Sequence, residues 1–188
     1  RSRRQRQMCI RDRLLGADLI FSDINKHGQQ DLTGIDKEDV KAIMTTGLYG
    51  DCHDHDLIAD LGIPVINDSC QAFLSKYKGK EATSIGDASA ISFAQNKTCP
   101  VFGTYGAVLT DRDDWADDFS HTRRCGYLSR NNVNLDHIGI NAQPHADKCV
   151  QVYTSLEYVL KWQERRQQIA DEYRDDLKAV SYTHLTLP

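Results

Sequence analysis

The sequence predicts an α/β fold in which helices flank a mainly parallel β-sheet. Two observations carry this prediction. Short apolar runs of strand length alternate along the chain with segments of helical periodicity. The chain has 188 residues, of which 40% are hydrophobic and 27% charged, so it can bury one core of ordinary size. Strands that alternate with helices are typical of a parallel sheet covered on both faces.

Five runs have the composition expected of strands in such a sheet. Each is short, is rich in aliphatic or aromatic side chains, and is bounded by polar residues or glycine. They are residues 17–23, 40–46, 64–68, 88–93 and 105–110. Ligands of an open α/β sheet bind beyond the carboxyl ends of its strands, so polar residues at those ends are candidates for a site.

Three segments between or after these strands are expected to be helical. Residues 56–61 form a short helix that Gly62 ends. Residues 113–124 begin with acids and end with basic residues, as the helix dipole favours. In residues 146–179, apolar side chains recur at helical spacing, which predicts one long amphipathic helix or two in tandem.

Both ends of the chain are expected to be translated sequencing adapter rather than native protein. Codons chosen for residues 4–12, read in phase on the complementary strand, give residues 180–188. Met8 has a single codon, whose complement is the histidine codon found at His184. We therefore leave residues 1–13 and 180–188 out of the fold prediction and expect residues 14–179 to be a fragment of a longer protein.

Composition argues against several classes of partner. The net charge is −4, and because residues 1–13 are arginine-rich, the remainder is more acidic still, which disfavours nucleic-acid binding. No apolar run is long enough for a membrane span, so a cytoplasmic protein is expected. The six cysteines are scattered without a C-x-x-C pair, which argues against a disulfide framework and a zinc ribbon.

The central stretch carries the residues of greatest chemical interest. Asp68 ends the third expected strand, Ser92 lies near the end of the fourth, and Lys97 follows in the next loop. Taken singly, Asp68 and Ser92 are more often caps of turns or helices, and Lys97 is more often a solvated surface charge. Their combination is what suggests a binding site.

Seven spaced blocks follow one another along the chain. They are Leu48-Tyr49-Gly50, Val65-Ile66-Asn67-Asp68-Ser69-Cys70-Gln71-Ala72, Gly86-Asp87-Ala88, Ser92-Phe93-x-x-x-Lys97, Gly103-x-x-Gly106-Ala107-Val108-x-Thr110, Gly139-x-Asn141 and Trp162-x-x-Arg165-Arg166. Taken in order, they resemble the DegT/DnrJ/EryC1/StrS family of sugar aminotransferases, which are pyridoxal-phosphate (PLP) enzymes of the aspartate-aminotransferase fold. The resemblance covers nearly all of residues 14–179. Gly47 and Phe73 stand where the family often has histidine.

The resemblance implies a role for each of five residues. Lys97 would be the catalytic lysine, because only a primary amine forms an imine with the cofactor, and once released it would shuttle a proton. Asp68 would pair with the pyridine nitrogen, and Gln71 would lie against the ring or its hydroxyl. Ser92 would hydrogen-bond the phosphate. Asn141 would reach the phosphate held by a neighbouring subunit.

The resemblance also implies an activity, partners and a domain plan. The parent protein would be a homodimer that moves an amino group from an amino acid, glutamate being the expected donor, to a nucleotide-linked keto-sugar for polysaccharide or antibiotic sugar synthesis. Residues 14–145 would be part of an incomplete PLP-binding large domain. Residues 146–179 would lead toward a C-terminal domain, so this chain alone is expected to be inactive.

Other functions remain open at this point. A non-catalytic homologue or regulatory binding module of the same fold is the main alternative, and a PLP-dependent lyase or desulfurase is a third. Sugar dehydratases of the family have histidine where this chain has Lys97. The run from Cys52 to Asp56 holds metal-binding residue types, but consecutive residues cannot all converge on one ion, so no metal site is expected.

Overall fold

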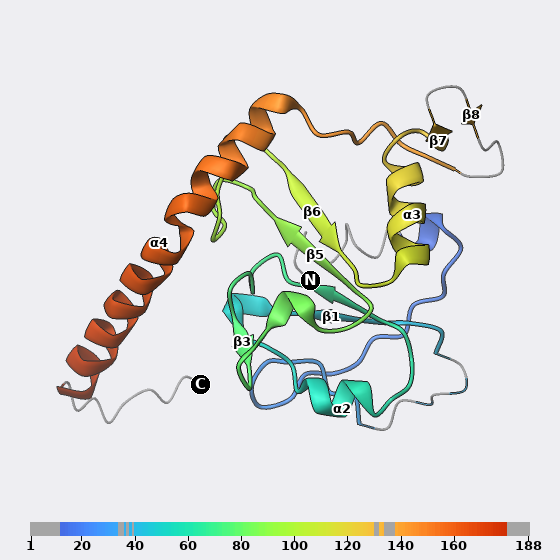
Figure 1. Ribbon diagram of the computed structural model, residues 1–188. Coiled ribbons are helices and arrows are strands. Elements are labelled where there is room, and N and C mark those ends of the chain that lie inside the picture. Colours follow the sequence, from blue (N-terminus) through green and yellow to red (C-terminus); the bar gives the residue numbers. More distant parts are fainter. Residues whose placement is uncertain are drawn as a thin grey trace.

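The computed structural model describes residues 12–33, 36, 38, 40–129, 132–133 and 138–179. A four-stranded sheet forms its centre, and the long helix α4 extends from the sheet past the rest of the molecule (Figure 1). Most of residues 1–13 and all of residues 180–188 lie outside the described ranges, so the adapter prediction for the two ends stays a prediction.

The central sheet is mainly parallel, as predicted. Its order is β1 (Ile43–Thr46), β2 (Val65–Asp68), β5 (Ala88–Ser92) and β6 (Gly106–Leu109). The first three strands run parallel, and β6 pairs antiparallel with β5. The four expected strands between residues 40 and 110 are therefore confirmed, with bounds within three residues of those predicted.

The expected strand at residues 17–23 is wrong. These residues form no strand, and the side chains of Ile20 and Phe21 are 70% and 72% exposed. A single antiparallel bridge joins Ile24 to Gln30 instead. An apolar run becomes a strand only when a sheet edge is available to satisfy its backbone, and in the described residues no strand pairs with this run.

The helices agree more closely with expectation. The short helix α2 spans His55–Ala59, α3 spans Asp113–Thr122, and residues 146–179 form the single helix α4 (Ala146–Ala179) of 34 residues. Short one-turn 3-10 helices, η1 (Leu48–Gly50) and η2 (Ala82–Ser84), lie in the connections. None of the helices in the described ranges is long and apolar enough to cross a bilayer.

Two small antiparallel hairpins complete the fold. One joins β3 (Lys76–Tyr77) to β4 (Lys80–Glu81), and the other joins β7 (Tyr127–Ser129) to β8 (Asn132–Val133). The first hairpin is tied to the start of α2, because the Tyr77 hydroxyl donates to Asp54 Oδ1 at 2.7 Å. Asp54 is also the N-cap of α2.

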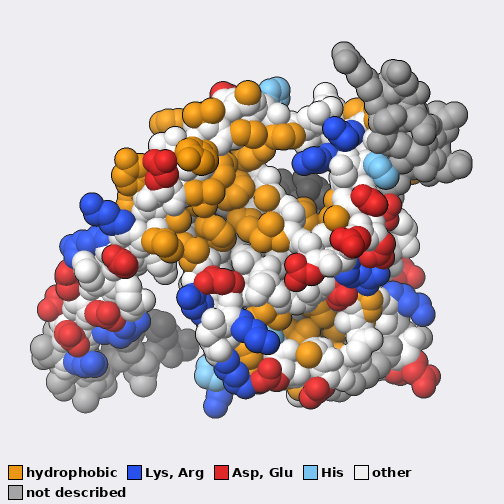
Figure 2. Space-filling model, viewed as in Figure 1, with side chains coloured by type: hydrophobic (Ala, Val, Ile, Leu, Met, Phe, Trp, Pro, Cys, Tyr) orange, Lys and Arg blue, Asp and Glu red, His pale blue; other side chains and the backbone are white. Residues whose placement is uncertain are grey.

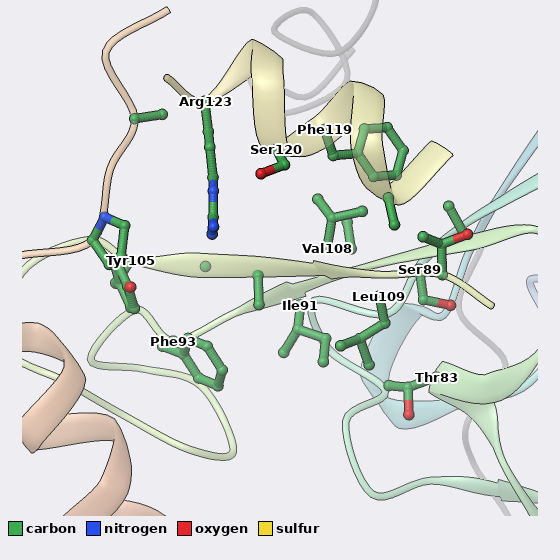
Figure 3. A pocket seen from close by; sticks show the side chains of 18 of the residues that line it. Thr83, Ser89, Ile91, Phe93, Tyr105, Val108, Leu109, Phe119, Ser120 and Arg123 are labelled. Atoms are coloured by element: carbon green, nitrogen blue, oxygen red, sulfur yellow. The ribbon is translucent and has the colours of Figure 1, made fainter. Parts of the chain in front are cut away.

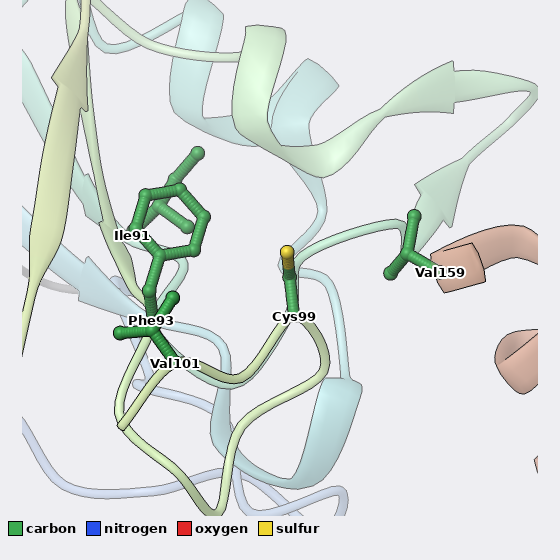
Figure 4. Packing of buried hydrophobic residues seen from close by; sticks show 5 residues of the cluster. All are labelled: Ile91, Phe93, Cys99, Val101 and Val159. Carbon is green, nitrogen blue, oxygen red and sulfur yellow. The ribbon is translucent and has the colours of Figure 1, made fainter. Parts of the chain in front are cut away.

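Two apolar clusters form the core. One lies beneath β1 and β2 and contains Leu32, Ile43, Ile58 and Val65. The other joins the sheet to α4 and contains Ile91, Phe93, Cys99, Val101 and Val159 (Figure 4). Phe73, at a position where histidine was expected from the family, packs edge-on against Phe93 with ring centroids 6.4 Å apart.

A buried polar pair fixes β1 against β2. Thr45 is fully buried and donates its hydroxyl to Asn67 Oδ1 at 3.1 Å, and Asn67 Nδ2 donates to the Ala82 carbonyl at 2.8 Å. Replacing Asn67 with leucine would leave both partners buried and unsatisfied. We expect this change to lower the free energy of unfolding by about 2–3 kcal/mol in urea titrations, and Thr45→Val by about 1 kcal/mol. Equal losses in the two variants would contradict this account.

Candidate functional site

The candidate site lies where two parallel strands end. Asp68 is the last residue of β2, and Ser92 is the last residue of β5. The strands are neighbours, with Asp68 opposite Ala90, so their carboxyl ends open on one edge of the sheet. This is the edge at which an open α/β sheet binds its ligands. The structure thus brings together two residues that are 24 positions apart in the sequence.

Hydrogen bonds from neighbouring backbone N–H groups hold Asp68 in place. Its Oδ1 accepts the Cys70 N–H at 3.0 Å, and its carbonyl accepts the Gly47 N–H at 3.0 Å. This side-chain-to-backbone turn fixes the carboxylate at the start of the loop after β2. The Cys70 side chain also bonds the Asp68 carboxylate.

Lys97 lies in the turn that follows β5. Ser92 Oγ accepts the Ala94 N–H at 3.3 Å, and the Lys97 N–H donates to the Ala94 carbonyl at 2.9 Å. The Lys97 side chain is half-buried, and across the described ranges its amine takes part in no hydrogen bond or ion pair. A half-buried amine without a partner is available for chemistry.

The Cys70 thiol follows Asp68 in the loop after β2. Burial is the main cause that raises the pKa of Cys70 to about 12, and the bond to Asp68 and its charge add to the effect. The positive charge of Lys97 acts on the same thiol in the opposite direction.

Gln71 belongs to the same loop, and its carboxamide is already engaged on one side. Its Oε1 accepts the backbone N–H of Tyr49 at 3.1 Å. Sequence patterns did not predict this contact, because Tyr49 stands out only as part of a family block. Gly47 and Gly50, which lie on either side of Tyr49, were the available signal of an unusual backbone there.

Asn141 is not brought to this site. It lies in an exposed segment, in an isolated antiparallel bridge with Arg124. The backbone around it is tied to the end of α3, because the Ile140 N–H donates to Thr122 and the Ala142 N–H to Arg123. Its expected role toward a second subunit stays a prediction.

The residues at the strand ends fit pyridoxal phosphate. They offer the unpartnered amine of Lys97, the carboxylate of Asp68, the Ser92 hydroxyl hydrogen and the Gln71 amide nitrogen. These groups match the aldehyde, pyridine nitrogen, phosphate and ring hydroxyl of the cofactor in chemical type. None of these four contacts would bring two groups of the same charge together.

A large apolar groove lies elsewhere. It has a volume of about 1490 Å³ and runs over β5 and β6 beside α3 and α4, where hydrophobic side chains gather on the surface (Figure 2). Figure 3 shows Ile91, Val108 and Leu109 on the strands, with Phe119 and Arg123 across from them. Asp68, Gln71, Ser92 and Lys97 do not line this groove, so it is separate from the candidate site.

The histidines of the run Cys52 to Asp56 make contacts within the fold. His53 Nε2 bonds the Thr46 carbonyl at 3.1 Å, and the His55 ring packs edge-on against Tyr77 with centroids 5.3 Å apart. Among the described residues, no three His, Cys, Asp or Glu side chains form a group that could hold a metal ion.

His55 makes the fold sensitive to acid. It is 6% exposed with both ring nitrogens unpartnered, and burial lowers its pKa from 6.5 to about 4, with the charge of His53 acting in the same direction. The unfolded chain therefore binds a proton first as the pH falls. We expect the free energy of unfolding to drop by about 3 kcal/mol between pH 7 and pH 4.

The matched variant His55→Phe keeps an aromatic ring beside Tyr77 and removes the titrating group. Urea unfolding at pH 7, 5.5 and 4 should show a smaller loss of stability on acidification than in the unchanged chain. An identical pH dependence in both proteins would show that His55 is not the cause.

Comparison with known proteins points to one protein family. The model of the DegT/DnrJ/EryC1/StrS aminotransferase family matches residues 13–188. UDP-2-acetamido-2-deoxy-3-oxo-D-glucuronate aminotransferase of Pseudomonas aeruginosa is 31% identical, with 89% of this chain and 48% of that protein covered. GDP-perosamine synthase of Escherichia coli O157:H7 is 32% identical, with 90% and 48% covered.

The fold agrees with the sequence comparisons. The crystal structure of a DegT DnrJ EryC1 StrS aminotransferase from Brucella abortus superimposes with a TM-score of 0.80 at 23% identity, and covers 89% of this chain and 49% of that chain. This chain thus spans about half the length of the relatives it matches. The chain belongs to the DegT/DnrJ/EryC1/StrS aminotransferase family.

Proposed function

We propose that this chain supplies the cofactor site of a PLP-dependent sugar aminotransferase. One observation carries the proposal: Asp68 and Ser92 end neighbouring parallel strands, and the turn that follows Ser92 holds the unpartnered amine of Lys97. A carboxylate, a hydroxyl and an amine thus follow the carboxyl edge of the sheet, where an open α/β sheet binds its ligands. The family membership of the chain supports the same reading.

Each residue has a defined task in the proposed site. Bound PLP supplies an aldehyde for covalent attachment and a ring that accepts the electrons of a broken C–H bond. Asp68 holds a proton on the pyridine nitrogen, which strengthens that electron demand. Ser92 and Gln71 orient the cofactor by hydrogen bonds. Lys97 attaches the cofactor and, when free, carries a proton to or from the substrate carbon.

The proposed substrates are an amino acid, with glutamate as the expected donor, and a keto-sugar attached to a nucleotide. The names of the two relatives support the second substrate class, since one contains a UDP-linked oxo-sugar and the other a GDP-linked amino sugar. We further propose a homodimer, in which Asn141 faces the cofactor of the partner subunit. The exposure of Asn141 and its separation from the site of its own chain support this arrangement.

Covalent labelling tests the proposed cofactor site. The protein is incubated with PLP, reduced with borohydride, digested, and analysed by mass spectrometry. We expect the reduced cofactor on the peptide that holds Lys97, in preference to exposed lysines such as Lys80 and Lys161. Equal labelling of all lysines would contradict the proposal and favour a non-catalytic homologue of the same fold.

A further inference from the structure

The loop that holds η1 lies directly against the loop after β2. The Gly47 N–H donates to the Asp68 carbonyl at 3.0 Å. A Cβ placed on Gly47 would lie 2.6 Å from Ala72 Cβ and 2.8 Å from the Asp51 carbonyl oxygen, closer than real Cβ atoms come. Glycine is therefore required at position 47, where the family often has histidine, and it lets the two loops touch.

Tyr49 adopts a backbone conformation that is unfavourable for its residue type. Its φ is 58° and its ψ is 18°, in the left-handed region that favours glycine. The side chain is 95% exposed, so packing of the ring does not hold it there. Two hydrogen bonds hold the turn: the Asp51 N–H donates to the Leu48 carbonyl at 3.0 Å, and the Tyr49 N–H donates to Gln71 Oε1 at 3.1 Å.

This bond determines which end of the Gln71 carboxamide faces the site. A backbone N–H can bond only to the amide oxygen, so Oε1 is taken and the orientation of the amide is fixed. The amide nitrogen has no hydrogen-bond partner in the described part of the structure, and it is left as a donor. Gln71 is therefore prepared to donate a hydrogen bond to a ligand, not to accept one.

We propose that the loop Gly47–Gly50 is a positioning element for the cofactor residues: it bonds the backbone of Asp68 and turns Gln71 into a hydrogen-bond donor toward an acceptor atom of PLP. The proposal rests on the proposed function for the identity of the ligand. The loop contact itself is a property of the chain without cofactor. The two parts can therefore be tested separately.

Amide hydrogen exchange, followed by NMR without cofactor, tests the loop contact. In Gln71→Ala the Tyr49 N–H loses its acceptor, and we expect it to exchange about 3- to 10-fold faster than in the unchanged chain. The Gly47 N–H bonds to Asp68 and serves as the internal control, whose exchange should stay the same. An unchanged Tyr49 rate would overturn the positioning role.

PLP titrations test the direction of the Gln71 bond. Gln71→Glu keeps an oxygen for Tyr49 but removes the donor, so it should retain slow Tyr49 exchange and bind PLP about tenfold or more weakly. Retention of full PLP affinity in this variant would overturn the donor assignment. If the unchanged chain binds no PLP, the proposed function fails with the donor assignment, whereas the exchange experiment still decides the loop contact.

A pair of glycine variants separates loop geometry from general loss of stability. Gly47→Ala forces a methyl group against Ala72 and should weaken PLP binding by about tenfold. Gly62→Ala places the same methyl group where no atom lies within 4 Å, at a φ of +65°, so it strains the backbone away from the site. Equal effects of the two variants on PLP affinity would overturn the proposal.

Discussion

In the longer protein that the sequence leads us to expect, replacing Lys97 with alanine should abolish covalent attachment of PLP and slow amino transfer from glutamate by about 10³-fold, because the attaching amine and the proton carrier are lost together. The turn that holds Lys97 depends on backbone bonds to Ala94, which alanine retains. The fold should therefore survive the change. The measurement is the visible absorption of the protein with PLP, followed after glutamate is added.

Lys161→Ala is the matched control, since Lys161 is exposed on α4. It should keep both the absorption band and its bleaching by glutamate. Retention of the band in Lys97→Ala would remove Lys97 from its proposed role. Absence of the band in the unchanged protein would instead favour a homologue that binds no cofactor.

Asp68→Asn is expected to weaken PLP binding by about 10- to 100-fold, because a charge-assisted hydrogen bond to the pyridine nitrogen is replaced by a neutral one. Asparagine keeps an oxygen that can accept the Cys70 N–H, so the loop after β2 should retain its shape. Equilibrium titration with PLP measures the effect. Thermal unfolding of the cofactor-free protein checks that the fold is unchanged.

An exposed carboxylate distinguishes a local effect from a change in overall charge. Asp118 lies on α3 and is exposed, so Asp118→Asn changes the net charge equally but lies outside the proposed site. It should bind PLP as tightly as the unchanged chain. Weakening of the same size in both variants would show that Asp68 acts only through the general electrostatic field.

The fold was largely predictable because its elements carry strong local patterns. The strands that end at Asp68 and Ser92 are short apolar runs bounded by polar residues, and they form adjacent parallel strands as expected. The acids in the first turn of α3 and the helical spacing of apolar side chains in residues 146–179 predicted helices, and helices form at both places. These patterns depend on near neighbours, which the sequence displays directly.

The one expected strand that fails depends on a distant partner. Residues 17–23 have the composition of a strand but form none, since strand formation requires a neighbour with free backbone groups. Two further features were left undetermined by the local pattern for the same reason: β6 runs antiparallel because it pairs with β5 in that direction, and the His55 ring packs against Tyr77, which is 22 residues away.

The sequence by itself determined the family of this chain, its α/β class and the identity of the candidate cofactor residues Asp68, Gln71, Ser92 and Lys97, since these depend on residue types at fixed spacing. Only the tertiary structure decided that Tyr49 bonds Gln71 and that Gly47 touches Ala72. Those contacts join segments more than 20 residues apart, and the chain must fold before the distance between such segments is defined.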